Sequence, residues 1–148
     1  MKIEIIKKNK KDFLDLLLLA DEQENMIDKY IERGIMFAIY DNDLKGVCIV
    51  TKEEDRAYEI KNIAIYENFH GQGYGKKLIE YICEYFKGDC DIIYVGTGDS
   101  PLTVPFYEKC GFKKSHRIKN FFIENYDNPI YECGKQLIDM IYLKRKFN

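Results

Sequence analysis

Three glycines within five positions interrupt the stretch NFHGQGYGKK, residues 68–77, and they separate two well-patterned segments. The run IKNIAIY before them is typical of a buried strand, and KKLIEYICEYF after them repeats apolar residues at helical spacing. The first amides of a helix lack a partner within it, and the helix dipole adds positive potential there. A strand, a glycine turn and a helix start therefore suit an anion, so that Gly71, Gly73 and Gly75 with the amides of residues 71–76 could cradle a pyrophosphate. A purely structural loop is the alternative.

Hydrophobic patterning predicts further strands and helices along the chain. The expected strands are 2–6, 35–40, 45–51, 57–66, 91–96, 112–118 and 136–147, and the expected helices are 10–20, 23–33, 75–86 and 100–110. Gly34 is expected to end the second helix as a C-cap. Ser100 suits the N-cap of the last helix and Pro101 its first position, whereas Pro105 should distort it. This order indicates one domain, residues 1–148, with a mixed α/β or α+β sheet and helices on both faces.

Composition narrows the classes of function. The net charge of −2 argues against a basic nucleic-acid face, and 46% hydrophobic residues argue against disorder. The N-terminus lacks a signal-peptide pattern and FLDLLLLA is far too short to span a bilayer, so we expect no membrane partner. The 5 cysteines form no C-x-x-C pair and three lie in apolar runs, which predicts a reduced, cytoplasmic compartment.

The glycine turn matches neither the phosphate loop G-x-x-x-x-G-K-S/T nor the dinucleotide motif G-x-G-x-x-G. It resembles the acetyl-CoA signature Q/R-x-x-G-x-G/A of the GCN5-related N-acetyltransferase (GNAT) superfamily. The frame here is His70-Gly71-Gln72-Gly73-Tyr74-Gly75, in which two glycines match and His70 replaces Gln or Arg. The block PFYEKCGF, residues 105–112, is similar to a second family block, xxYEKxGF, and the element order agrees over nearly the whole chain.

This resemblance implies a GNAT-like fold, with a largely antiparallel sheet of six to seven strands. It also implies direct acetyl transfer from acetyl-CoA to a primary amine of a small molecule or peptide. The sequence has no zinc-like cluster of His and Cys, so we expect no metal. Tyr107 takes the position of the family's general acid, which protonates the departing thiolate. The strand edge at Ile63–Ile65 would pair with the pantetheine arm, and the Ile65 amide would polarise the thioester carbonyl. The expected CoA-binding residues are Ile63, Ala64, Ile65, His70, Gly71, Gln72, Gly73, Tyr74, Gly75, Lys76, Ser100 and Phe106.

The general base has two candidates. Glu59 lies at even spacing from Lys61, Ile63 and Ile65, which predicts that the four share one strand face. Some members of the family use a carboxylate near this position, often through a water molecule. The rival is His116, because histidine is the residue type most often used as a general base. A structural role remains the alternative for each of the two residues.

The aromatic segment 119–135 has no predicted form, but its residues suit a cationic amine through cation–π contacts and ion pairs. These residues are Phe121, Phe122, Tyr126 and Tyr131 with Glu124, Asp127 and Glu132. A core or homodimer contact would explain the aromatics equally well. Two other functions stay open: a non-catalytic acyl-CoA sensor or interaction module, against which an intact Tyr107 argues, and an ATP-binding protein, which lacks the expected lysine–serine pair.

Overall fold

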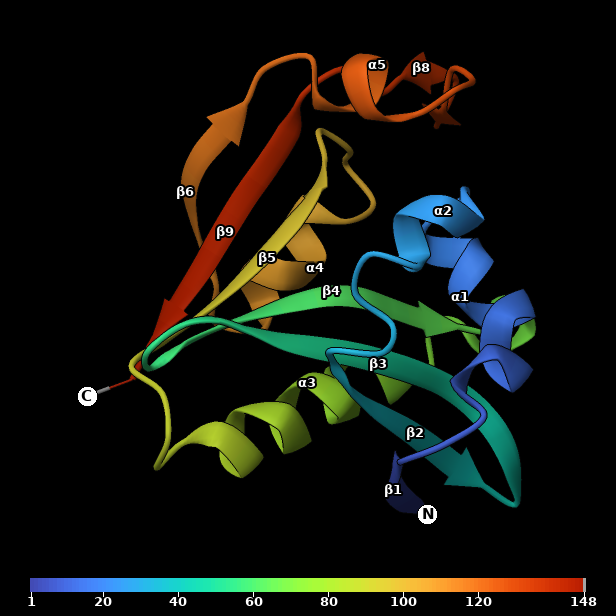
Figure 1. The fold of residues 1–148 in the computed structure, drawn as a ribbon, viewed down its shortest axis with the longest axis vertical. Helices are drawn as coiled ribbons and strands as arrows, with labels where there is room; N and C mark the ends of the chain where they lie inside the picture. Colours follow the sequence, from blue (N-terminus) through green and yellow to red (C-terminus); the bar gives the residue numbers. More distant parts are fainter. Residues whose placement is uncertain (148) are drawn as a thin grey trace.

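The computed structural model describes residues 1–147 and is built around a seven-stranded sheet of order β1-β2-β3-β4-β5-β9-β6 (Figure 1). Its strands are β1 (Lys2–Ile6), β2 (Ile35–Asp41), β3 (Asp43–Glu54), β4 (Ala57–Ile65), β5 (Ile92–Gly98), β6 (Lys113–Ile118) and β9 (Met140–Lys146). Neighbouring strands are antiparallel except β4 and β5, which are parallel and joined through a helix. The mixed, largely antiparallel sheet is confirmed.

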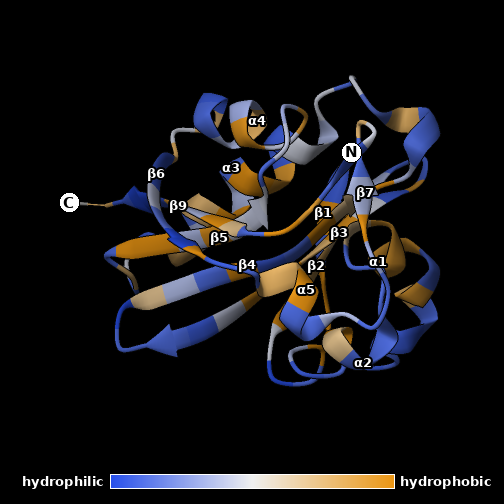
Figure 2. Cartoon of the chain, turned by 90° about the horizontal axis from the view of Figure 1, so that it is seen from above, coloured by the Kyte–Doolittle hydropathy of each residue, from blue (hydrophilic) through white to orange (hydrophobic). Residues whose placement is uncertain are grey.

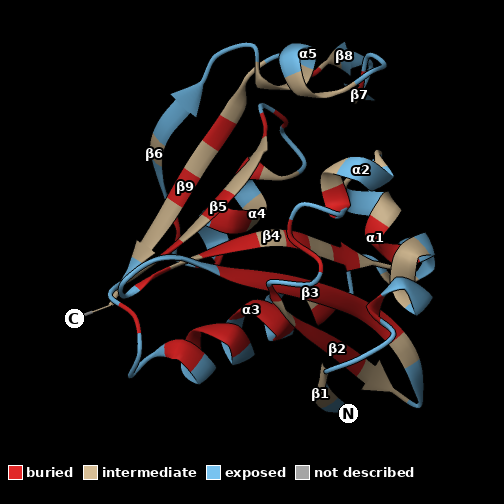
Figure 3. Ribbon diagram, in the orientation of Figure 1, coloured by how far each residue is buried: buried red, intermediate tan, exposed pale blue. Residues whose placement is uncertain are grey.

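Helices cover both faces of this sheet, as predicted. One face carries α3 (Tyr74–Phe86) and α4 (Val104–Lys109), and the opposite face carries the 3-10 turn Lys10–Phe13, α1 (Leu14–Ala20) and α2 (Glu24–Ile27). Each face has its own core cluster, with Leu78, Ile82 and Phe86 of α3 on one side and Leu16 and Leu17 of α1 on the other. Figures 2 and 3 show the hydrophobic and buried residues concentrated on the central strands and the inward sides of these helices.

The second helix is much shorter than predicted. The 23–33 pattern yields only α2, followed by turns, and Gly34 is not a left-handed C-cap. A Cβ on Gly34 would lie 2.5 Å from Ile49 Cγ2, so glycine permits close packing here instead. The buried Lys10 ammonium donates to the Ile31 and Gly34 carbonyls at 3.0 and 2.8 Å. A side chain from outside the segment therefore satisfies its last carbonyls.

The helix predicted over 100–110 is reduced to α4, which begins at Val104. Ser100 is not its N-cap: the Ser100 hydroxyl accepts a hydrogen bond from the Leu102 amide at 3.1 Å and closes a preceding turn. Pro105 therefore falls in the first turn of the helix, where no intrahelical amide is lost, and it causes no distortion. Gly111 ends α4 at φ +91°, as expected.

The strand predicted over 136–147 is divided. The aromatic segment forms α5 (Phe121–Asn125) and a small hairpin of β7 (Tyr131–Glu132) and β8 (Lys135–Gln136), and only Met140–Lys146 joins the main sheet as β9. In Figure 1 this α5–β8 region lies at the end of the molecule that α2 also approaches. No helix within residues 1–147 is long and apolar enough to cross a membrane.

Candidate active site

The two parallel strands at the centre of the sheet diverge and open a cleft. Pairing between β4 and β5 runs from Ala57 opposite Ile92 to Ile60 opposite Val95 and then stops. Residues 61–65 of β4 have no strand partner on the β5 side (Figure 1). A cleft of about 1090 Å³ occupies this opening, and the glycine turn, β4, β5, α4 and the aromatic segment all contribute to its walls.

The glycine turn lies at one end of the cleft, directly before α3. Gly71 and Gly73 have φ of +79° and +87°, which β-carbon-bearing residues rarely adopt, and a Cβ on either would meet nothing within 4 Å. Within residues 1–147, the amides from Gly71 to Lys76 donate to no backbone acceptor, whereas the Lys77 amide already bonds the Gly73 carbonyl at 3.0 Å. The turn therefore presents free donors at a helix N-terminus.

A cation–π contact fixes the segment that leads into this turn. The ammonium of the buried Lys45 on β3 lies 3.5 Å from the Phe69 ring centroid and 5.9 Å from that of Tyr74. The Tyr74 hydroxyl donates to the Asp41 carboxylate at 2.8 Å. On the other side, a Cβ on Gly75 would lie 3.1 Å from Phe106 Cζ. These contacts hold the turn between β3 and α4.

The open edge of β4 presents backbone donors to the cleft. The Tyr66 amide donates to the Lys45 carbonyl of β3 at 3.0 Å. Because successive amides of a strand point to opposite edges, the N–H groups of Ile65 and Ile63 point toward the open side. His70 Nε2 lies 2.8 Å from the Ile65 carbonyl oxygen, which occupies that carbonyl and ties the glycine turn to the strand end.

Glu59 does not share a face with Ile63 and Ile65, so that part of the prediction is wrong. The register jumps from Ile49 opposite Asn62 to Val50 opposite Ile60, which makes Lys61 an extra residue in a β-bulge. The extra residue reverses the alternation of side chains beyond it. Ile63 and Ile65 pack on the α3 side, whereas Asn62 donates to the Leu17 carbonyl of α1 on the other side.

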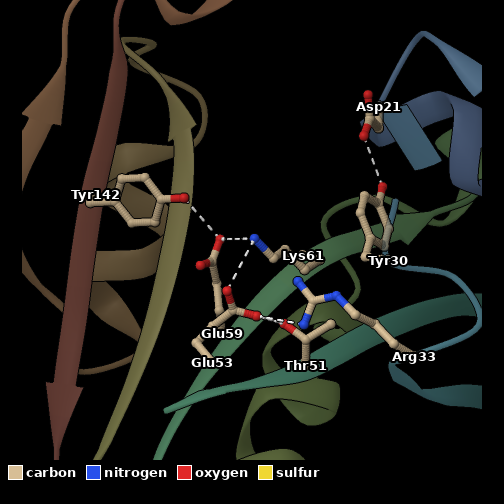
Figure 4. Close-up of polar contacts among 8 residues, drawn as sticks. All are labelled: Asp21, Tyr30, Arg33, Thr51, Glu53, Glu59, Lys61 and Tyr142. Carbon is tan, nitrogen blue, oxygen red and sulfur yellow. Dashed lines mark hydrogen bonds and ion pairs between the residues drawn. The ribbon is translucent and has the colours of Figure 1, made fainter. Parts of the chain in front are cut away.

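Glu59 is 8% exposed and lies in a polar network on the cleft wall (Figure 4). Its carboxylate accepts a hydrogen bond from the Tyr142 hydroxyl at 2.9 Å and pairs with the Lys61 ammonium at 3.1 Å. Lys61 also lies 3.9 Å from Glu53, which accepts from Arg33 at 2.9 Å. Burial, reinforced by the Glu59 charge, raises the pKa of Tyr142 well above its ordinary value, so its hydroxyl stays a donor.

His116, the rival base, lies outside the cleft. It is exposed on the edge strand β6, and its ring stacks on Tyr142 with centroids 4.8 Å apart. Of the two candidates, the structure therefore places Glu59 alone on the cleft wall.

Tyr107 of α4 reaches the cleft from the side opposite to α1. Its side chain is buried, and its ring packs edge-on against Phe106 and Phe112 at 5.2 and 6.1 Å. Within residues 1–147 its hydroxyl has no hydrogen-bond partner. Burial, with smaller contributions from Cys48, Cys110 and Glu132, raises the pKa of Tyr107 well above its ordinary value. The phenol is therefore protonated at neutral pH.

Most of the predicted residues come together in the cleft. Its lining includes Glu59, Ile63, Ala64, Ile65, His70, Gly71, Gly73, Tyr74, Gly75, Lys76, Phe106 and Tyr107. Gln72 and Ser100 lie outside this lining, and Ser100 is buried in the turn before α4. The Lys76 side chain is 59% exposed and lies 4.0 Å from Glu80, an ordinary surface pair.

Several known proteins are similar to this chain in sequence and in fold. The acetyltransferase (GNAT) domain family matches residues 32–114. The uncharacterised N-acetyltransferase YvbK of Bacillus subtilis is 36% identical over 146 residues, which cover 97% of this chain and 94% of YvbK. The chain belongs to the GNAT acetyltransferase family.

Two solved GNAT structures are also similar to this N-acetyltransferase. An acetyltransferase from Elizabethkingia anophelis with acetyl-CoA bound has a TM-score of 0.93 at 34% identity, over 99% of this chain and 97% of that one. A Bacillus subtilis acetyltransferase in complex with CoA has a TM-score of 0.91 at 35% identity, over 99% of both chains. GNAT enzymes use acetyl-CoA and need no metal. Residues 1–147 hold no group of three or more His, Cys, Asp or Glu side chains arranged for a metal ion.

Several polar residues of the GNAT cleft were not predicted from the sequence. Asp21 and Tyr30 come from the α1–α2 region and Asn62 from the middle of β4, and all three line the cleft. Asn62 stands out in the run IKNIAIY as a polar residue among apolar ones, which is a usable signal. Asp21 and Tyr30 resemble ordinary surface residues in sequence, so that only the fold reveals their position.

Proposed function

We propose that this GNAT enzyme transfers an acetyl group from acetyl-CoA directly to a primary amine of a small molecule or peptide. One observation carries the proposal: a single cleft joins the free donors of the glycine turn, the open edge of β4, Tyr107 and Glu59. The cleft passes between diverging strands, so that two substrates can meet in it from opposite sides of the sheet.

The glycine turn is proposed to hold the pyrophosphate of CoA. Six consecutive amides, from Gly71 to Lys76, donate to no acceptor of the described chain, residues 1–147, and lie at the N-terminus of the thirteen-residue helix α3. Donors and dipole both favour an anion at this position. Gln72 contributes its amide in this scheme, and Phe106 packs against the turn at Gly75. The position of Ser100 in the turn before α4 gives no support to its predicted contact with CoA.

Acetyl-CoA supplies an activated acyl group as a thioester. The open edge of β4 would bind its pantetheine arm as an added strand, and the Ile65 amide would donate to the thioester carbonyl oxygen. The orientation of the Ile63 and Ile65 amides supports this role, since both point to the unpaired edge. Ala64 and the side chains of Ile63 and Ile65 would shape the channel.

Tyr107 and Glu59 are proposed to move the two protons of the reaction. Glu59 accepts the proton of the acceptor ammonium through a water molecule, which frees the nitrogen lone pair for attack on the carbonyl carbon. As the carbon–sulfur bond breaks, Tyr107 donates its phenolic proton to the departing sulfur. The raised pKa of Tyr107 keeps the phenol protonated at neutral pH, so that its proton is available when the thiolate departs.

A CoA-release assay against a panel of primary amines, read together with mass spectrometry of the products, tests the reaction. The proposal requires acetyl-CoA-dependent release of CoA and a product that is heavier than the amine by one acetyl group. CoA release without an acetylated amine would indicate hydrolysis and would contradict the assignment.

Gly73→Ala is expected to weaken CoA binding by tenfold or more, which corresponds to about 1.4 kcal/mol. The new Cβ meets no protein atom within 4 Å. Any loss of CoA affinity beyond the effect of backbone strain therefore reflects a clash between this Cβ and the bound phosphates. Gly134→Ala is the matched control, because Gly134 also has positive φ and open space but lies in the β7–β8 turn. Calorimetric titration with CoA measures both. Equal CoA affinity in the two variants would refute the cradle.

A cytoplasmic location and a homodimer complete the proposal. The free thiols of Cys48, Cys83, Cys90 and Cys110 are buried and pack as small apolar groups, which fits a reducing compartment. Light scattering of the purified chain tests the dimer, which remains a prediction from the aromatic segment.

A further inference from the structure

A carboxylate without a cationic partner among the described residues lies where the α1–α2 region and the aromatic segment meet at the cleft. Asp21 Oδ2 accepts a hydrogen bond from the Tyr30 hydroxyl at 2.8 Å, and Asp21 Oδ1 accepts one from the Tyr126 hydroxyl at 2.7 Å. All three residues line the cleft, and Asp21 is partly exposed there. Within residues 1–147 this carboxylate forms no ion pair. Two phenols thus hold it in one orientation while its charge stays unneutralised.

The surroundings of Asp21 suit an organic cation. The Tyr126 ring stacks on Phe122 with centroids 5.7 Å apart, and Phe121 lies edge-on to Tyr126 at 6.3 Å. Faces of aromatic rings attract ammonium groups, and a nearby carboxylate adds to the attraction. The Asp127 amide also donates to the Gln23 side chain at 2.8 Å, so the aromatic segment and the α1–α2 region are joined on this side.

The side-chain oxygen of Asn62 lacks a hydrogen-bond donor within residues 1–147, which is independent evidence for a ligand at this site. It is 3% exposed and lines the cleft, and its Nδ2 donates to the Tyr30 hydroxyl at 3.1 Å and to the Leu17 carbonyl. Its Oδ1 is buried and has no partner within residues 1–147. An unpaired buried acceptor is costly, and a ligand that brings N–H donors would offset that cost after a small adjustment.

The nearby cations do not already neutralise this region. Arg33 and Lys61 line the same cleft, but both are engaged with Glu53, and Lys61 also pairs with Glu59. Lys29 is exposed on the α2 side. Figure 4 shows Asp21 and Tyr30 across the cleft from the Glu59–Tyr142 pair. Asn62 lies three residues beyond Glu59 on β4, a distance of roughly 10 Å along the strand.

We propose that the acceptor is an aliphatic diamine or polyamine, whose second ammonium group binds at Asp21 among Tyr30, Phe122 and Tyr126. The first amine reacts between Glu59 and Tyr107, and a chain of several methylene groups crosses the cleft between the two. This inference rests on the proposed acetyl transfer and specifies its substrate class. Asp21 acts as a specificity determinant, because it binds the nitrogen that does not react.

The test compares two acceptors of equal length, 1,6-diaminohexane and hexylamine, in the wild type and in Asp21→Asn. We expect the wild type to prefer the diamine at least tenfold in kcat/KM. Asp21→Asn keeps an oxygen for a tyrosine hydroxyl but removes the charge. It should raise KM for the diamine about tenfold, with little change in kcat, in hexylamine turnover or in CoA affinity. Asp89→Asn, which changes an exposed carboxylate outside the cleft lining, should behave as the wild type.

A second variant, Tyr126→Phe, tests the inference in case Asp21→Asn does not fold. Tyr126→Phe keeps the ring and removes one hydrogen bond to Asp21, so the preference for the diamine should fall but persist. A wild type that accepts both amines equally, or an Asp21→Asn variant that is folded and retains the preference, would overturn the inference and leave acetyl transfer standing. If neither amine nor any other primary amine were acetylated, the proposed function itself would fail.

Discussion

Tyr107→Phe should lower kcat by about 10²-fold while the affinity for CoA stays nearly constant, as expected for the loss of a general acid. The ring contacts with Phe106 and Phe112 remain, and within residues 1–147 the hydroxyl has no hydrogen bond to lose. The thermal midpoint should therefore change little, since the substitution removes no hydrogen bond among the described residues. Steady-state kinetics, CoA titration and thermal unfolding give the three readouts.

Tyr58→Phe is the matched control for Tyr107. Tyr58 packs on Phe86 at 4.4 Å and is not part of the cleft lining, so its hydroxyl should not matter to turnover.

The pH profile of the wild type adds a further check on the role of Tyr107. The ordinary pKa of tyrosine is about 10. Because burial raises the pKa of Tyr107, loss of its proton should limit activity only at a pH above that value. An unchanged kcat in Tyr107→Phe would assign the acid role to another group or to water.

Glu59→Gln should lower kcat/KM by about 10²-fold near neutral pH, the lower end of the range for general bases. A base must be ionised, so the wild type should lose activity on the acidic side, and the variant should lack that limb. At high pH more of the acceptor amine is already neutral, and part of the activity should return. The glutamine can still accept the Tyr142 hydrogen bond, and Lys61 retains Glu53 nearby.

Two comparisons separate this role from structural effects. Glu53→Gln removes a charge from the same Lys61 network but outside the cleft, and its pH profile should match that of the wild type. His116→Ala removes the rival base and should also keep the acidic limb. If Glu59→Gln kept the wild-type profile while His116→Ala lost its acidic limb, His116 would take the base role in place of Glu59.

The strength of local signals explains how much of the site was predictable. The glycine turn needs positive φ at Gly71 and Gly73, and few residues other than glycine satisfy that need, so the turn was visible in the sequence. Tyr107 was visible for a different reason, because the block around it resembles a family pattern. Neither prediction required knowledge of which strands are neighbours.

Features that depend on distant contacts were predicted poorly. The helix expected over 23–33 is mostly turn, and its last carbonyls accept hydrogen bonds from Lys10, a residue far away in sequence. The face of Glu59 was wrongly assigned relative to Ile63, because a single bulged residue, Lys61, reverses the alternation. No local pattern marks a bulge whose cause lies in pairing with the neighbouring strand.

The sequence by itself determined the order of the main-sheet strands and the glycine turn, since backbone conformation and hydrophobic period are local properties, and it revealed Tyr107 through its resemblance to a family block. The tertiary structure alone decided where β4 and β5 separate, which side of the sheet Glu59 faces, and that Asp21, Tyr30 and Tyr126 meet. Asp21 and Tyr126 are 105 residues apart, and their contact exists only because packing on both faces of the sheet brings two distant segments together.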